Sequence, residues 1–147
     1  MNITIIGTGY VGLVTGACFS ETGNSVTCLD VNQEKIHSLS SGNIPFFEPG
    51  LKELVLRNIE GNRLRFTDSY EQACQAEVYF ICVGTPDAGD GTTDLSGLMA
   101  VLKSLNDNLR KDSHIFIKST VPLGTNKMTN EFFKKNNRYN VRVSSNP

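Results

Sequence analysis

Three glycines near the N-terminus separate a short apolar run from a longer helical pattern. They lie in Gly7-Thr8-Gly9-Tyr10-Val11-Gly12, directly after the β-branched run 2–6. This Gly-x-Gly-x-x-Gly pattern predicts a strand that turns sharply into a helix inside a β-α-β unit. In such a turn Gly7 allows the tight bend, Gly9 leaves room beside the backbone for a pyrophosphate, and Gly12 lets the helix pack closely on the sheet. The motif therefore constrains both the local fold and the ligand that the fold can hold.

The rest of the chain alternates β-branched runs with helical patterns, which is typical of a parallel sheet with helical crossovers. We expect strands at 2–6, 25–29, 63–67, 78–83, 113–118 and 141–144. We expect helices at about 10–22, 32–40, 49–58, 70–75, 95–109 and 120–135. Right-handed crossovers then predict an α/β fold, a doubly wound parallel sheet (Rossmann fold) with strand order 3-2-1-4-5-6.

Helix starts are predicted from capping residues and prolines. Asn32 and Ser69 are expected N-caps, and Ser119 or Thr120 is expected to cap the last helix. Pro49 and Pro122 suit the first turns of their helices, where a missing N–H costs nothing.

An acidic residue completes the glycine pattern. Asp30 lies 18 residues after Gly12, at the predicted carboxyl end of the second strand. A carboxylate there accepts hydrogen bonds from the adenosine ribose hydroxyls and repels the extra phosphate of NADP. We therefore expect NAD rather than NADP as cofactor. Lys35, one turn into the next helix, is either a further donor near the ribose or adenine or a solvated surface lysine.

The strand order reverses between the first and fourth strands, and ligands of doubly wound sheets bind beyond that point. Gly84 and Thr85 follow the fourth strand, so we expect them to face the cofactor. They could also simply end the strand. Ser119 and Thr120 follow the fifth strand and place hydroxyl groups near the expected nicotinamide side, although ordinary helix capping explains them equally well.

Composition excludes several classes of partner. The chain has 14 Lys+Arg and 15 Asp+Glu, and 14 − 15 gives a net charge of −1. A main role in binding nucleic acid or an acidic membrane surface would need a basic excess. The sequence has neither a transmembrane run nor a signal peptide, and we expect a cytoplasmic location with no membrane contact.

No metal site is expected. The four cysteines (Cys18, Cys28, Cys74 and Cys82) form no C-x-x-C pair, and the two histidines belong to no ligand-like cluster. We expect the cysteines to be buried, reduced thiols. Asp90 and Asp94, in the turn-rich loop 84–94, could bind a cation, but their spacing fits a turn better than a calcium loop.

The motifs together resemble the nucleotide-sugar dehydrogenases, and among them the UDP-glucose 6-dehydrogenases of the UDP-glucose/GDP-mannose dehydrogenase family. The resemblance covers the whole chain. It lies in the glycine loop with Tyr10-Val11, in Asp30, and in the segments I-P-F-F-E-P-G-L at 44–51, V-G-T-P at 83–86, D-G-x-x-D-L at 90–95 and K-S-T-V-P-x-G-T at 118–125.

The resemblance implies an NAD-dependent enzyme. Members of this family oxidise the C6 hydroxyl of a UDP-sugar to a carboxylate with two NAD, through a thiohemiacetal and a thioester on a cysteine. By resemblance, the loop Gly7, Gly9, Tyr10, Val11 and Gly12 holds the pyrophosphate, and Asp30 and Lys35 hold the adenosine end. Thr85 and Thr120 lie on the nicotinamide side, and Thr120 matches a threonine that positions a catalytic water.

Other family features are missing from the 147 residues. None of the four cysteines lies in the glycine-rich segment of the family nucleophile, and the N-P-E-F motif stops after Asn146-Pro147. The central helix and the UDP-sugar-binding domain are absent as well. We expect residues 1–147 to be an NAD-binding domain that binds NAD without turnover. The full-length protein is expected to be a homodimer whose second half supplies most UDP-sugar contacts.

Two alternatives stay open. The first is another nucleotide-sugar dehydrogenase, acting on GDP-mannose or a UDP-N-acetylhexosamine. The second is a ligand-sensing Rossmann module such as the regulatory domains of potassium channels, which would not be expected to carry the loops at 83–95 and 118–125.

Overall fold

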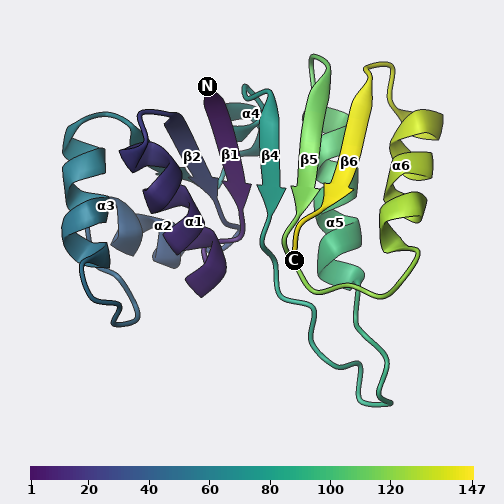
Figure 1. The fold of residues 1–147 in the computed structure, drawn as a ribbon, viewed down its shortest axis with the longest axis horizontal. Helices are drawn as coiled ribbons and strands as arrows, with labels where there is room; N and C mark the ends of the chain where they lie inside the picture. The colour runs from purple at the N-terminus through teal and green to yellow at the C-terminus, as the bar shows by residue number, and fades with distance from the viewer.

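The computed structural model describes all residues, 1–147, as one parallel sheet flanked by helices. The strands are β1 (Asn2–Ile6), β2 (Ser25–Leu29), β3 (Leu64–Thr67), β4 (Val78–Ile81), β5 (Ser113–Ile117) and β6 (Val141–Ser145). The helices are α1 (Tyr10–Glu21), α2 (Gln33–Ser40), α3 (Leu51–Glu60), α4 (Tyr70–Ala73), α5 (Ser96–Asn108) and α6 (Thr125–Asn136). Figure 1 shows α1 on one face of the sheet and α5 on the other.

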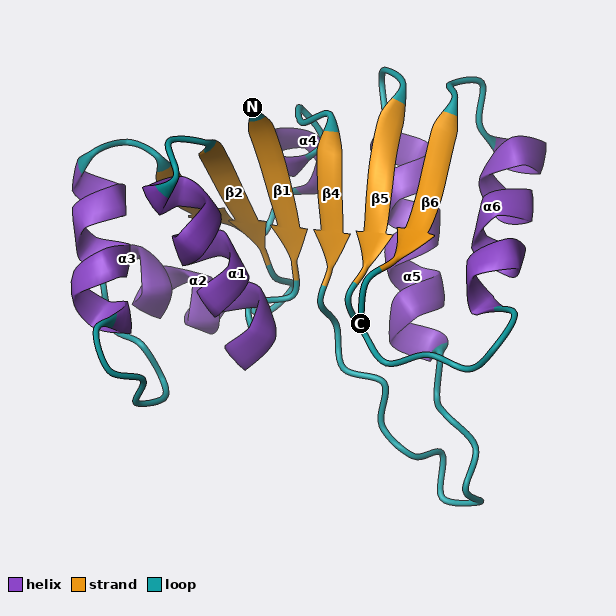
Figure 2. Ribbon diagram, in the orientation of Figure 1, coloured by secondary structure: helices purple, strands orange, loops and turns teal.

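The strand order is β3-β2-β1-β4-β5-β6, and every neighbouring pair is parallel. The predicted doubly wound fold and its strand order are therefore confirmed. All strands point the same way, so their carboxyl ends and the loops that follow gather along one edge (Figure 2). The chain leaves β1 toward β2 and leaves β4 toward β5, which places the reversal point of the sheet between β1 and β4.

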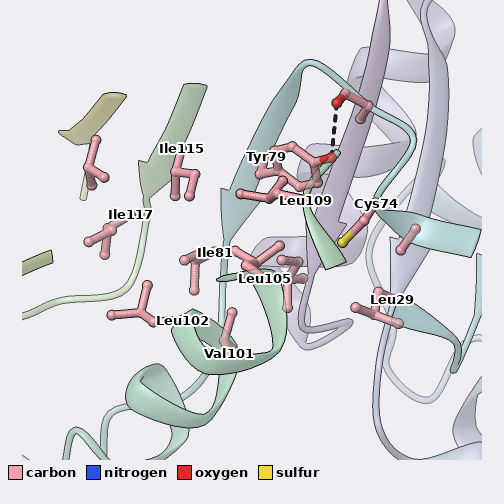
Figure 3. Packing of buried hydrophobic residues seen from close by; sticks show 14 of the residues in the cluster. Leu29, Cys74, Tyr79, Ile81, Val101, Leu102, Leu105, Leu109, Ile115 and Ile117 are labelled. Atoms are coloured by element: carbon pink, nitrogen blue, oxygen red, sulfur yellow. Dashed lines mark hydrogen bonds between the residues drawn. The ribbon is translucent and has the colours of Figure 1, made fainter. Parts of the chain in front are cut away.

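Each face of the sheet has its own apolar core, because successive strand residues point to opposite sides. On one face, Ile3, Ile5, Val26 and Cys28 pack with Leu13 and Ala17 of α1 and with Leu51 and Val55 of α3. On the other, Tyr79, Ile81, Ile115 and Ile117 pack against Leu102 and Leu105 of α5 (Figure 3). The Tyr79 hydroxyl donates to the Ala76 carbonyl at 2.9 Å, so this buried phenol keeps a hydrogen bond.

Two predicted caps are confirmed, and two predicted helix starts are wrong. The side chains of Asn32 and Ser69 accept hydrogen bonds from the backbone N–H groups of Lys35 and Gln72. Neither Ser119 nor Thr120 caps α6, which begins after Gly124, a residue with φ of 91°. In the same way α3 begins at Leu51 after Gly50, so Pro49 and Pro122 lie before their helices rather than in the first turns.

No helix of the structure combines the length and the apolar character that crossing a membrane would require.

Candidate functional site

The glycine loop joins β1 to α1, and two of its glycines are required by the fold itself. Gly7 has φ of 95°, and a Cβ on it would lie 2.8 Å from the Cys82 carbonyl oxygen. A Cβ on Gly12 would overlap the Gly7 carbonyl oxygen. At Gly7 the loop after β1 approaches the backbone that follows β4, and at Gly12 the first turn of α1 approaches the loop after β1. Neither approach leaves room for a side chain.

Gly9 is different, because nothing in the chain requires a glycine there. Its φ is −68°, which any residue adopts, and a Cβ would meet no atom within 4 Å. Gly84, after β4, is likewise open, since a Cβ there would also meet no atom within 4 Å. Open space beside the backbone at both glycines fits a ligand that approaches the main chain closely, as a pyrophosphate does.

The start of α1 offers donors toward the same space. The backbone N–H groups of Tyr10, Val11 and Gly12 have no acceptor within the chain, and no side chain caps the helix. Free N–H groups and the positive end of the helix dipole make such a terminus a binding site for anions. Tyr10 and Val11 are about half exposed, at 52% and 48%.

Tyr10 also ties the glycine loop to the segment before α3. Its hydroxyl donates to Glu48 Oε2, at 2.6 Å, and its ring lies 5.1 Å from that of Phe46. The hydrogen bond to Glu48 raises the pKa of Tyr10. Segment 44–51, which carries part of the family resemblance, thus contacts the first turn of α1.

Asp30 follows β2 and carries several hydrogen bonds. Its Oδ2 accepts from the Thr8 backbone N–H at 2.9 Å, from the Thr8 hydroxyl at 2.7 Å and from Lys35 Nζ at 2.9 Å. Its Oδ1 accepts from the Asn32 N–H at 3.2 Å. Burial opposes ionisation, but the hydrogen bonds from Thr8, Lys35 and Asn32 outweigh it and lower the pKa of Asp30. The carboxylate is therefore charged at neutral pH, as its predicted role requires.

Two hollows meet at the reversal point of the sheet. One, of about 360 Å³, is lined by Gly7, Asp30, Val31 and Tyr70 on one side and by Gly84, Gly97 and Ser104 on the other. The second, of about 310 Å³, is lined by Gly9, Tyr10 and Val11 and by Thr85, Lys118 and Thr120. They share Val83 and Gly84, so together they form one crevice that runs across the glycine loop.

The loops after β4 and β5 are joined to each other at the second hollow. Ser119 Oγ donates to the Val83 carbonyl at 2.6 Å, and Thr85 Oγ1 donates to the Thr120 carbonyl at 2.7 Å. The Thr85 hydroxyl therefore cannot donate to a ligand while this bond is formed, but its oxygen can still accept a hydrogen bond. The Thr120 hydroxyl is exposed and has no partner in the chain, which leaves it available to a ligand or a water.

All the predicted site residues lie along this crevice or contact one that does. Lys35 reaches it through its ion pair with Asp30, so it is not merely a solvated lysine. Sequence reasoning missed Thr8, Tyr70 and Ser104 as site residues. Thr8 occupies a variable position of the glycine motif, and Tyr70 and Ser104 come from helices whose register against the sheet only the tertiary structure sets.

The cysteines and the acidic loop add no reactive centre. Cys28 and Cys74 are buried as expected, but Cys18 is exposed, because it lies on the outward side of α1. Cys82 lines the second hollow, where burial raises the pKa of its thiol to about 11 against the opposing effect of Lys118. Asp90 accepts a hydrogen bond from the Thr92 N–H, and Asp94 accepts one from the Ser96 N–H, so both carboxylates bond to the backbone two residues on, as expected of a turn. No group of three or more His, Cys, Asp or Glu side chains could hold a metal ion.

Known proteins are similar to this chain in sequence and in fold. UDP-glucose 6-dehydrogenase YwqF of Bacillus subtilis is 44% identical over 150 residues, covering 100% of this chain and 34% of the relative. A UDP-glucose dehydrogenase from the archaeon Pyrobaculum islandicum matches with a TM-score of 0.93 at 32% identity, covering 99% of this chain and 35% of that one. GDP-mannose dehydrogenase from Pseudomonas aeruginosa matches with a TM-score of 0.88 at 31% identity, covering 100% and 36%.

The chain spans about a third of the length of the curated relatives it matches. The sequence profile of the NAD binding domain of the UDP-glucose/GDP-mannose dehydrogenase family matches residues 1–147. The chain therefore belongs to the UDP-glucose/GDP-mannose dehydrogenase family and corresponds to its NAD binding domain.

Proposed function

We propose that residues 1–147 form one domain and bind NAD in an extended conformation along the crevice. The adenosine would lie in the hollow beside Asp30, and the nicotinamide in the hollow beside Thr85 and Thr120. The observation that carries this proposal is the open space at Gly9 together with the unpaired N–H groups that begin α1. These groups would hold the pyrophosphate, because they supply directed donors and positive potential at the centre of the crevice.

Each predicted residue has a distinct part in the proposal. Gly7 and Gly12 shape the loop, and the N–H groups of Tyr10 and Val11 face the phosphates. Asp30, held by Lys35, accepts a hydrogen bond from the adenosine ribose. Gly84 leaves room for the central part of the cofactor, between the adenosine and the nicotinamide. Thr85 and Thr120 present oxygen atoms to the nicotinamide side.

For the whole protein, we propose oxidation of UDP-glucose at C6 to UDP-glucuronate, in which two NAD each accept one hydride and one water supplies the second carboxylate oxygen. The support is similarity to UDP-glucose 6-dehydrogenases along the entire chain. Within this domain, the free Thr120 hydroxyl is suited to orient a water for hydrolysis of an acyl intermediate. Cys82 is unsuited to be the nucleophile, because a thiol with a pKa of about 11 is almost entirely protonated at neutral pH. We infer that the domain alone binds NAD without turnover, because the glycine-rich cysteine segment and the UDP-sugar-binding domain of the family lie outside residues 1–147.

GDP-mannose or a UDP-N-acetylhexosamine is the alternative substrate, since a GDP-mannose dehydrogenase shares the fold at 31% identity. Assay of the full-length gene product with each nucleotide sugar, following NADH formation, decides between them. We also infer a homodimer for the full-length protein, from the resemblance to its family. A reducing, cytoplasmic location agrees with four cysteines that are all free thiols.

Calorimetric titration of the 147-residue chain with NAD, NADP, ATP and UDP-glucose tests the binding site. We expect NAD to bind, NADP to bind more weakly because of the Asp30 charge, and UDP-glucose to bind little. Binding of ATP without any response to NAD would instead favour a ligand-sensing module.

The variant Asp30→Ala tests the ribose contact. Losing a charge-assisted hydrogen bond should weaken NAD by about 1.5–3 kcal/mol. It should also narrow the preference for NAD over NADP, because the negative charge is gone. Asp107→Ala, which changes an exposed aspartate near the end of α5, is the matched control. Unchanged NAD affinity in the Asp30 variant would show that the ribose contact is assigned wrongly.

A further inference from the structure

Thr8 lies inside the glycine motif but lines neither hollow of the crevice. Its side chain is fully buried, with 0% of the residue exposed. Its hydroxyl and its backbone N–H both donate to the same atom, Asp30 Oδ2, at 2.7 Å and 2.9 Å. The loop after β1 is thereby joined to the end of β2 by two hydrogen bonds to one carboxylate oxygen.

Lys35 completes the arrangement from the other side. Its Nζ lies 2.9 Å from the same Oδ2, so three donors converge on one oxygen. The second oxygen, Oδ1, accepts only the Asn32 N–H, at 3.2 Å. A carboxylate has about four acceptor sites on its two oxygens, so Oδ1 keeps the free capacity. The Asp30 side chain is 14% exposed and lines the first hollow of the crevice.

We propose that Thr8 is the residue that positions the Asp30 carboxylate for the cofactor, and so sets how strongly the site senses the ribose 2′ position. This inference rests on the NAD site proposed above. Thr8 holds Oδ2 inward, so Oδ1 is presented to the 2′-hydroxyl before the cofactor arrives. Preorganisation of this kind adds affinity because the side chain loses no further freedom on binding.

The hydroxyl of Thr8 matters more than the Lys35 ammonium for this purpose. Lys35 has a long side chain that is 28% exposed, so water screens its charge and its position can adjust. Thr8 is buried and short, and its backbone N–H also donates to Asp30 Oδ2, which restrains its position. Without its hydroxyl, Oδ2 would keep the N–H and a mobile lysine, and the carboxylate could rotate away from the ribose.

The test compares NAD with an analogue that lacks the 2′-hydroxyl of the adenosine ribose, in calorimetric titrations of the 147-residue chain. In the wild type we expect the analogue to bind about tenfold more weakly than NAD, because one charge-assisted hydrogen bond is lost. In Thr8→Val we expect NAD to bind about three- to tenfold more weakly, and the difference between NAD and the analogue to shrink to about twofold. Thr8→Ser, which keeps the hydroxyl, should restore most of that difference.

The ratio of the two affinities separates positioning from a general loss of structure. A partly unfolded sample lowers the measured number of sites equally for both ligands, so it does not change the ratio. Thr4→Val is the matched control, because Thr4 is also buried and its hydroxyl donates to the Ala73 carbonyl at 2.6 Å, away from the strand ends. It should reduce stability and leave the ratio unchanged.

The outcomes distinguish this inference from the proposed function. If the wild type binds no NAD, the proposed function itself is wrong. If the wild type binds NAD and Thr8→Val keeps the full difference between NAD and the analogue, the positioning role of Thr8 is overturned. Should Thr8→Val fail to fold, Thr8→Ala gives the same comparison, since it removes the hydroxyl without placing an added methyl group beside the carboxylate.

Discussion

At the scale of single residues, Gly9 and Gly12 belong to one motif, but a side chain at each position would meet different surroundings. Gly12 is required by the Gly7 carbonyl oxygen, an atom of the protein itself. Gly9, the N-cap of α1, faces open space and has an ordinary backbone conformation, so no contact within the chain excludes a side chain there. Gly12 is therefore needed for the fold of the loop, and Gly9 is needed to leave space for the bound cofactor.

This contrast predicts opposite effects for the same substitution. Gly9→Ala should change the free energy of unfolding by no more than about 1 kcal/mol, because alanine reduces the freedom of the unfolded chain but is a poorer N-cap for α1 than glycine. It should weaken NAD by about tenfold or more, or about 1.4 kcal/mol, because the methyl group occupies the space of the pyrophosphate. Gly12→Ala should lower the free energy of unfolding by about 3 kcal/mol or more, because its methyl group would overlap the Gly7 carbonyl oxygen. Urea unfolding and NAD titration measure both; unimpaired NAD binding in Gly9→Ala would contradict the proposed site.

Asp30 also predicts a pH dependence of stability. Although burial opposes its ionisation, hydrogen bonds from Thr8, Lys35 and Asn32 lower its pKa in the folded state. A lowered pKa contributes stability that is present above the unfolded value, about 3.9, and is lost as pH falls through the folded value. The stability difference between wild type and Asp30→Asn should thus be constant from about pH 5 to 7 and shrink below about pH 4.

Urea unfolding of both proteins between about pH 3 and 7 measures this difference. Glu21 and Glu77 also have lowered pKa values, through hydrogen bonds from Arg57 and Lys111. They titrate in both proteins, so their contributions cancel. A difference that stays constant down to about pH 3 would show that the hydrogen bonds to Asp30 do not favour its charged form.

At the scale of elements, the distance between α1 and the sheet depends on Gly16. A Cβ on Gly16 would lie 2.6 Å from Cys28 Sγ and 3.4 Å from Ile5 Cγ1, so the helix rests directly on β1 and β2. Alanine should gain about 1 kcal/mol in helix propensity but lose about 1–3 kcal/mol through overpacking. We expect the loss to dominate, because Cys28 is buried and has little room to move.

A double-mutant cycle checks this contact. Gly16→Ala alone should lower the free energy of unfolding, and Cys28→Ala in the same chain should recover part of the loss by removing the sulfur atom. The expected coupling is about 0.5–3 kcal/mol, typical of residues in direct contact. Strict additivity of the two changes would mean that α1 does not press on Cys28.

Helix starts show where sequence reasoning at this scale succeeds and where it fails. Asn32 and Ser69 were predictable as caps because their side chains bond to backbone N–H groups within the same turn. The start of α6 was not, because residues 119–120 belong to the loop after β5, where the Ser119 hydroxyl donates to the Val83 carbonyl and the Thr120 carbonyl accepts from Thr85. Gly124 was the better indicator of the helix start. Its φ of 91° is a conformation that glycine adopts readily, and α6 begins at the next residue.

At the scale of the whole molecule, the crevice joins both halves of the sheet. Residues at the ends of β1 and β2 and in the loops that follow them line one side, and residues after β4, from α5 and after β5 line the other. A ligand that spans both sides binds the folded state and cannot bind the unfolded one. It should therefore stabilise the chain as a single unit.

Thermal unfolding with and without NAD tests this coupling. At a concentration of about 100 times its Kd, NAD should add about 2.7 kcal/mol to the free energy of unfolding. For a chain of this size that corresponds to a rise in Tm of about 5–10 °C. UDP-glucose at the same concentration, as the control ligand, should shift Tm little. Equal shifts with both ligands would contradict a site selective for NAD.

The sequence by itself determined the order of the elements, the parallel sheet, the glycine loop and the position of Asp30. These depend on local patterns, namely β-branched runs, helical spacing and a turn that glycine permits, so they can be read along the chain. The tertiary structure decided the rest. Thr8 bonds to a residue 22 positions away, and Tyr70 and Ser104 reach the crevice from separate helices. Contacts of this kind arise because distant segments meet at the strand ends, and no periodicity in the sequence records which side chains meet there.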